Sequence, residues 1–237
     1  MTFLVKICGL STPDTLDAAL DAGADLVGFV FFPPSPRHLD MATARHLGRR
    51  VDGRAGKVAV MVDPDDGLLA AIIDALDPDM LQLHGRESPD RVRAVRSRFG
   101  LPVMKAVPVA DAGDLAKVPA YAPVADRLLF DARPRPDATR PGGLGRRFDW
   151  ELLAGLDAEV PFLLSGGLDA ENVATAVAVT RAPGVDVSSG VERAPGVKDA
   201  RMITAFVGEA RRAAAATDPW PSHGSACRRP SGQPHGR

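Results

Sequence analysis

The feature that most constrains the fold is a regular alternation of short apolar, β-rich runs with helix-like segments along most of the chain. The runs with strand signals are residues 3–7, 26–31, 57–62, 80–83, 102–107, 127–130, 161–164 and 185–187. The segments with helix signals are residues 13–21, 41–49, 66–75, 89–98, 111–117, 150–154, 170–179 and 198–212. Proline at the first helical position, as in Pro13 and Pro89, supports several of these helix starts. A strand–helix unit therefore repeats eight times.

Eight such units in about 210 residues predict an α/β protein of one domain, a closed (β/α)8 TIM barrel over residues 1–216. An open doubly wound sheet is the alternative, but it usually has fewer strands, and no GxGxxG fingerprint follows the first strand. In barrels of this type the functional residues lie at the carboxyl ends of the strands. We therefore look for the site in the residues that directly follow each apolar run.

The last residues differ in composition from the rest of the chain. Residues 217–237 alternate proline with glycine, serine, histidine and arginine. Such a segment buries too little apolar surface to offset the entropy lost on ordering. We expect a disordered tail after a last helix that the alanine run 213–216 extends.

Composition and charge exclude several functional classes. The 237 residues carry a formal net charge of -1, with 45% hydrophobic and 25% charged residues, so no basic surface indicates nucleic acid and no segment indicates a membrane. The apolar start of the chain is too short for a signal peptide. Cys8 and Cys227 have neither disulfide nor metal-site spacing, so we expect a cytoplasmic protein with no metal site. With nucleic acid and membranes excluded, we expect its partner to be a small molecule.

Cys8 lies at the end of the first predicted strand, where it is either a small buried hydrophobe or a reactive thiol. Period-two alternation places Lys6 on the same face, one layer deeper in the barrel. Its ammonium would favour the Cys8 thiolate and lower the thiol pKa toward neutrality. The alternative is a structural pair between Lys6 and Asp186. We also expect Lys105, on the fifth strand, to be a second inward charge.

Three further polar residues follow predicted strands. Asp131 ends the sixth strand, opposite Cys8 on the ring, and is an acid–base candidate or else a cap. Arg37, in the loop after the second strand, could grip a carboxylate or phosphate, or could be a solvated surface residue. His84 ends the fourth strand on the same face as Gln82, and we expect at most a substrate contact from it.

Two glycine turns follow the seventh and eighth strands, namely Ser165-Gly166-Gly167 and Ser188-Ser189-Gly190. Glycine lets backbone N–H groups approach a ligand closely, and each turn leads toward a helix N-terminus that favours an anion. Loops at these two strands of a barrel frequently bind phosphate. The turns together predict a phosphate site.

Seven motifs in order along residues 5–206 resemble the phosphoribosylanthranilate isomerase family of tryptophan biosynthesis. They are Lys6-Ile7-Cys8-Gly9; Gly28-Phe29-Val30-Phe31 with Ser35 and Arg37; Gln82-Leu83-His84-Gly85; Asp131; Gly142-Gly143 with Gly145 and Phe148-Asp149-Trp150; Leu164-Ser165-Gly166-Gly167-Leu168; and Asp186-Val187-Ser188-Ser189-Gly190-Val191-Glu192. Each motif is modest alone, but the collinear set is specific.

The resemblance implies a cofactor-free Amadori rearrangement of N-(5-phosphoribosyl)anthranilate to its 1-deoxyribulose 5-phosphate isomer, with Cys8 as general base and Asp131 as general acid. It also implies that Arg37 binds the anthranilate carboxylate and the glycine turns bind the phosphate. The substrate-binding residues expected on this basis are Arg37, His84, Ser165, Gly166, Gly167, Asp186, Ser188, Ser189 and Gly190.

The chain departs from the family pattern at Leu144, where the glycine-rich loop usually carries serine or threonine. The proline- and arginine-rich residues 133–140 before it suggest a mobile lid. Two other functions stay open: a related histidine-pathway isomerase, which has an aspartate at the position of Cys8, and a non-catalytic phosphosugar-binding barrel. The sequence allows either a monomer or a homodimer.

Overall fold

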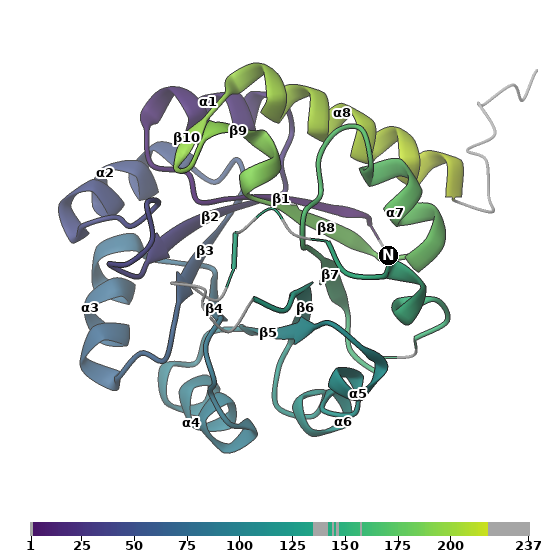
Figure 1. Ribbon diagram of the computed structural model, residues 1–237. Helices are drawn as coiled ribbons and strands as arrows, with labels where there is room; N and C mark the ends of the chain where they lie inside the picture. The colour runs from purple at the N-terminus through teal and green to yellow at the C-terminus, as the bar shows by residue number, and fades with distance from the viewer. Residues whose placement is uncertain (1, 135–141, 144, 146, 157, 218–237) are drawn as a thin grey trace, which may run out of the picture.

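The computed structural model describes residues 2–134, 142–143, 145, 147–156 and 158–217. Eight parallel strands close into a barrel in chain order, and helices surround it (Figure 1). The strands are β1 (Leu4–Cys8), β2 (Leu26–Phe31), β3 (Gly56–Met61), β4 (Met80–Leu83), β5 (Val103–Val109), β6 (Arg127–Ala132), β7 (Phe162–Leu164) and β8 (Gly184–Val187). The predicted (β/α)8 barrel is confirmed.

The strand register determines which side chains meet at the barrel mouth. Cys8 of β1 pairs with Gly28 of β2, and Lys6 of β1 pairs with Asp186 of β8. Because side chains alternate along a strand, Lys6 and Cys8 both face the barrel interior, as expected. Lys6 and Asp186, the last inward residue of β8, are thus neighbours one layer below Cys8.

The outer helices begin where the sequence provides capping groups. They are α1 (Pro13–Asp21), α2 (Met41–Val51), α3 (Asp66–Leu76), α4 (Pro89–Phe99), α5 (Ala112–Leu115), α6 (Val118–Tyr121), α7 (Val173–Thr180) and α8 (Ala200–Thr217). The side chains of Thr12, Asp40, Asp65 and Ser88 accept hydrogen bonds from the first turns of α1 to α4. These bonds satisfy amide groups that a helix start leaves free.

Three helical segments differ from the expectation. Within residues 111–117 only the four-residue helix α5 forms, and a second short helix, α6, follows it. Residues 150–154 form a 3-10 helix, η1 (Trp150–Leu153). After β8 come a 3-10 turn, η2 (Ser189–Val191), and a hairpin of β9 (Glu192–Ala194) and β10 (Val197–Lys198), so the last helix starts at Ala200 rather than at Lys198.

The expected inward orientation of Lys105 also needs correction. Its neighbours Met104 and Ala106 pack with Leu129 and Leu163 inside the barrel. Lys105 therefore faces the opposite side, between the barrel and the helices, where its Nζ lies 2.9 Å from Glu87 Oε2. The prediction of an inward charge at Lys105 is wrong.

Some predicted features lie outside the described residues. The predicted tail lies there from residue 218 onward, together with Cys227, while Thr217 is the last residue of α8. Leu144 and residues 135–140 of the predicted lid segment lie outside as well. No helix within the described ranges is long and apolar enough to cross a membrane.

Candidate active site

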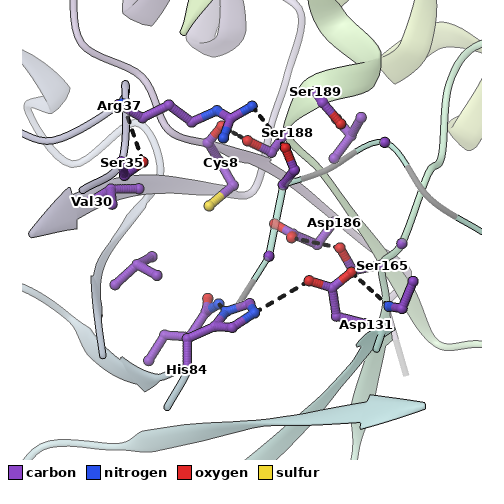
Figure 2. Close-up of a pocket in the computed structure, with 18 of the residues that line it drawn as sticks. Cys8, Val30, Ser35, Arg37, His84, Asp131, Ser165, Asp186, Ser188 and Ser189 are labelled. Carbon is purple, nitrogen blue, oxygen red and sulfur yellow. Dashed lines mark hydrogen bonds and ion pairs between the residues drawn. The ribbon is translucent and has the colours of Figure 1, made fainter. Parts of the chain in front are cut away.

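A pocket at the carboxyl ends of the strands collects nearly all the residues that the sequence singles out. Its lining includes Cys8, Arg37, His84, Asp131, Ser165, Gly166, Gly167, Asp186, Ser188 and Ser189. These residues come from β1, β6 and β8 and from the loops that follow β2, β4, β7 and β8 (Figure 2). Gly190 does not line the pocket: a Cβ there would lie 1.8 Å from the carbonyl oxygen of Leu168, so this glycine allows the turns after β7 and β8 to pack together.

The thiol of Cys8 points into the pocket (Figure 2). A Cβ on Gly28 would lie 2.9 Å from Cys8 Sγ, so the glycine leaves room for the sulfur. Only 7% of Cys8 is exposed. The sequence left open whether Cys8 is a small buried hydrophobe or a reactive thiol. In the structure the thiol is buried and is also part of the pocket wall.

Lys6, one layer deeper in the barrel, is the charged group with the largest electrostatic effect on Cys8. It is fully buried, and its Nζ lies 2.6 Å from Asp186 Oδ1, while Ser165 Oγ donates to Asp186 Oδ2 at 3.1 Å. Burial disfavours the charged form, but the attraction of Asp186 and Cys8 outweighs it and raises the pKa of Lys6. The structural pair with Asp186 and the contact with Cys8 therefore coexist.

The environment of Cys8 does not lower its pKa as we expected. Burial raises the pKa of the thiol, and the opposing attraction of Lys6 and Lys198 does not compensate. Asp186, close behind Lys6, also disfavours the thiolate. In the free protein Cys8 is therefore held mainly as a thiol at neutral pH.

Asp131 faces the pocket from the end of β6 and has two defined partners. Its Oδ1 accepts the Ala132 backbone N–H at 2.8 Å, and its Oδ2 lies 3.2 Å from His84 Nε2. The other ring nitrogen of His84 lies 2.9 Å from the amide nitrogen of Gln82. A Cβ on Gly142 would come within 2.8 Å of Asp131 Oδ2, so the glycine-rich loop passes directly over this carboxyl. His84 hence contacts the candidate acid as well as the pocket.

Arg37 is not the solvated residue of the alternative interpretation, because only 3% of it is exposed. Its Nε and Nη2 donate to the two carboxylate oxygens of Glu192, each at 2.7 Å. Lys198 Nζ donates to Glu192 Oε1 at 2.8 Å. A buried carboxylate between two cations thus fixes the guanidinium at the pocket wall.

The two glycine turns lie side by side at the rim. Gly166 and Gly167 have φ of +89° and +67°, which favours glycine, and a Cβ on Gly166 would lie 2.8 Å from the Ala132 nitrogen. The expectation that each turn leads toward a helix N-terminus needs correction. The turn after β8 enters only the three-residue η2, and α7 begins several residues beyond Gly167.

Sequence reasoning missed Lys198 and used Glu192 only as part of a motif. Lys198 was assigned to the start of the last helix, whereas it ends β10 and reaches the site. Pro195-Gly196 between the two short strands is a turn signal that could have indicated the hairpin. Among the described residues, no group of three or more His, Cys, Asp or Glu could hold a metal ion.

Comparison with known proteins identifies the family. The model of the N-(5'-phosphoribosyl)anthranilate isomerase family matches residues 5–209. The isomerases of Nitrobacter winogradskyi and Nitrobacter hamburgensis are 63% and 65% identical to this chain, each over 90% of the chain and 95% of the relative.

Solved structures agree with the sequence relationship. The phosphoribosylanthranilate isomerase of Thermotoga maritima covers 89% of this chain with its full length, at 33% identity and a TM-score of 0.80. An isomerase solved with reduced 1-(o-carboxyphenylamino)-1-deoxyribulose 5-phosphate has 32% identity and a TM-score of 0.78, with the same coverage. Of the functions considered from the sequence, the comparisons support one: the chain belongs to the N-(5'-phosphoribosyl)anthranilate isomerase family and is an isomerase of tryptophan biosynthesis.

Proposed function

We propose that Cys8 is the general base and Asp131 the general acid of the Amadori rearrangement of N-(5-phosphoribosyl)anthranilate. The observation that carries this proposal is that both side chains line one pocket, from β1 and β6 on different sides of the barrel mouth (Figure 2). A substrate between them would present its ring oxygen to one and its C2′ hydrogen to the other. Each positioned proton transfer contributes about 10²- to 10⁴-fold to the rate.

The reaction begins with ring opening. Asp131 gives its proton to the furanose ring oxygen, the bond from C1′ to that oxygen breaks, and the amine nitrogen forms a protonated Schiff base with C1′. Cys8 releases its thiol proton to solvent and, as thiolate, takes the proton from C2′, and the electron pair of that bond neutralises the Schiff base to an enolamine. Tautomerisation moves the hydroxyl proton of C2′ to C1′ and gives the ketone. Asp131 regains a proton from solvent, so atoms and charge balance over the cycle.

The raised pKa of Cys8 fits this order of events. Before the substrate binds, the thiol stays protonated, because burial disfavours a thiolate with no new positive charge beside it. The positive Schiff base formed by ring opening would lie beside the sulfur and favour its ionisation. Lys6 supplies a fixed positive charge on the other side. The base is therefore activated at the step that needs it.

Two anchors would hold the ends of the substrate. We assign the anthranilate carboxylate to the guanidinium of Arg37 and the phosphate to the adjacent turns Ser165-Gly166-Gly167 and Ser188-Ser189-Gly190. His84 would contact the substrate and the acid together, and Asp186 would serve through Lys6 and Ser165. The related isomerase solved with the reduced product analogue binds a phosphate and a carboxyphenyl group in one molecule.

Substitution of the acid and the base tests the proposal. Cys8→Ala removes the base, and Asp131→Asn keeps the shape of the acid without its proton. We expect each to lower kcat at least ~100-fold, measured by the loss of anthranilate-type fluorescence. Cys227→Ala, at the other cysteine of the chain, is the matched control and should keep the wild-type kcat. Near wild-type kcat in either test variant would remove that residue from its role.

The assembly and location of the protein are separate proposals. We infer a monomer or homodimer, since the dimeric isomerase of Thermotoga maritima, at 32% identity, has also been generated as monomers. Light scattering on the purified chain measures its mass, and a larger assembly would contradict this. A chain with only two cysteines, which lack disulfide spacing, supports a cytoplasmic location.

A further inference from the structure

Lys198 is a buried cation that the proposed mechanism does not use. The β9–β10 hairpin, an excursion between β8 and α8, carries it to the site, and only 6% of the residue is exposed. A lysine so deeply buried is rare unless its ammonium group is fully partnered. Its partners therefore indicate its role.

The ammonium of Lys198 meets three acceptors. It donates to the Ser188 backbone oxygen at 2.8 Å, to Ser188 Oγ at 3.2 Å and to Glu192 Oε1 at 2.8 Å. An ammonium group has three N–H donors, so this set matches the charged form. Burial lowers the pKa of Lys198, and Glu192 opposes that effect. The three acceptors therefore provide a partner for each N–H of the charged amine.

Each partner of Lys198 leads to a different part of the catalytic site. Ser188 Oγ donates to the backbone oxygen of Cys8 at 3.1 Å, so Lys198 is linked to the proposed base through one hydroxyl. Glu192 holds Arg37 through both carboxylate oxygens, so Lys198 is linked to the proposed carboxylate anchor through one carboxylate. Ser188 itself belongs to the proposed phosphate turn.

The backbone at Gly9 allows this convergence. Gly9 has φ of +78°, and a Cβ there would lie 2.4 Å from Arg37 Cδ and 3.3 Å from Ser188 Oγ. Because Gly9 has no side chain, Arg37 and Ser188 can pack directly against the backbone after Cys8. Lys198 binds Ser188 and the glutamate that holds Arg37, so its ammonium supports both side chains.

We propose that Lys198 is a positioning residue for this isomerisation, which holds the Cys8 backbone, the Ser188 turn and the Glu192–Arg37 pair in one arrangement. This inference rests on the proposed function, because it assigns a shared support to the base and the two anchors. Two cations and one carboxylate also leave the Arg37–Glu192–Lys198 cluster with one net positive charge. A substrate with a phosphate and a carboxylate meets a site of complementary charge.

The charge of Lys198 also acts on the base. The charged groups that influence Cys8 are Lys6 of β1, Asp186 of β8 and Lys198 of β10. Lys198 lowers the pKa of the thiol, although burial keeps it raised overall. Loss of this cation should therefore move the ionisation of Cys8 to higher pH.

The test is Lys198→Met, compared with Lys105→Met as a matched control. Both lysines are buried and paired with a glutamate, and neither lines the pocket itself. Lys198 donates to Ser188, which lines the pocket, whereas Lys105 faces the helices and none of its acceptors lines the pocket. We expect Lys198→Met to lower kcat/KM ~10- to 100-fold with a raised KM, because the anchors and the base lose their common support. In the pH profile of kcat/KM, the acidic limb of Lys198→Met should lie at higher pH than that of the wild type, because the Cys8 thiol loses a nearby cation.

Stability alone cannot produce this pattern. The pH of a limb does not depend on the fraction of folded protein, and Lys105→Met, which also breaks a buried ion pair, should keep the wild-type limb and KM. Glu192 keeps Arg37 in Lys198→Met, so no buried carboxylate is left unpaired. Should the methionine variant not fold, Lys198→Gln, which retains a donor for the Ser188 carbonyl, carries the same measurement.

The outcomes separate this inference from the proposed function. If the Lys198 variants have the wild-type KM and pH limb while Cys8→Ala loses turnover, Lys198 is no more than a structural residue and this inference fails alone. Wild-type turnover in Cys8→Ala would instead overturn the proposed function. A shifted limb and raised KM at Lys198, with an unaffected Lys105→Met, would support the inference.

Discussion

Replacing Lys6 with methionine should destabilise the barrel strongly, because it strands a buried carboxylate. Lys6 is fully buried, and Asp186 keeps only 5% of its side chain exposed at a separation of 2.6 Å. Breaking a buried ion pair by removing one partner typically costs ~3–5 kcal/mol. Asp186 retains the hydrogen bond from Ser165, which places the expected loss toward the lower end of that range.

Denaturant unfolding measures this loss directly. For a domain of 150–250 residues, 1 kcal/mol lowers Tm by about 2–4 °C, so a loss of ~3 kcal/mol should also lower Tm in a thermal scan by about 6–12 °C. The double variant Lys6→Met with Asp186→Asn removes the stranded charge and should recover part of the lost free energy of unfolding. Lys57→Met is the matched control. Its partner Asp77 has 98% of its side chain exposed, so this substitution should change stability little.

The dependence on pH gives a second check. The folded-state pKa of Lys6 is raised, so its contribution to stability is fully present below the ordinary value of 10.5 and is lost as pH rises through the folded-state pKa. The difference in stability between wild type and Lys6→Met should therefore shrink only in strongly alkaline solution. A loss below about 1 kcal/mol at neutral pH, or no recovery in the double variant, would refute the reasoning.

Three further predictions follow from the site and its packing. Gly142→Ala would place a Cβ 2.8 Å from Asp131 Oδ2 and should lower kcat at least ~10-fold; an unchanged kcat in the fluorescence assay would show that the loop moves aside freely. In a variant without the tail cysteine, Cys8 should react slowly with iodoacetamide at neutral pH and faster above pH 9.0, its ordinary value, because burial raises its pKa. Fast alkylation at pH 7 would contradict that direction. Gly190→Ala should lower Tm because its Cβ would overlap the chain after β7, whereas Gly208→Ala, with no atom within 4 Å, should keep or raise Tm in the same thermal scan.

The barrel could be predicted from sequence because its strands and helices differ in pattern throughout. All eight strands lie within two residues of their predicted positions, since each apolar run is bounded by charged or turn residues. The pocket could be predicted as well, because parallel strands bring the ends of every run to the same rim. Cys8, Asp131 and the two glycine turns meet there as expected.

Two features were harder to predict: which face of a strand points into the barrel, and the path of the chain between β8 and α8. A barrel strand is buried on both sides, so the apolar residues around Lys105 do not reveal which face points inward. Residues 192–198 contain no apolar alternation, and the hairpin that brings Lys198 to the site is only two to three residues wide on each strand. The hairpin also pairs with Arg37, 155 residues from Glu192, and sequence spacing does not reveal such a distant contact.

The balance of charges around Cys8 also lay beyond the sequence. A neighbouring lysine favoured a lowered pKa, yet the depth of burial and the nearby Asp186 reverse the sign. Both depend on the closed barrel. The direction could be obtained only once the exposed fraction and the partners of Lys6 were known.

The central claim is that Cys8 removes the C2′ proton after Asp131 opens the ring. Its most direct test is the single-turnover rate with substrate deuterated at C2′, compared among wild type, Cys8→Ala and Asp131→Asn. The wild type should show a primary isotope effect, Cys8→Ala should lose turnover, and slow ring opening in Asp131→Asn should suppress the isotope effect. A Cys8→Ala variant with the wild-type rate and the same isotope effect would show that another group takes the proton.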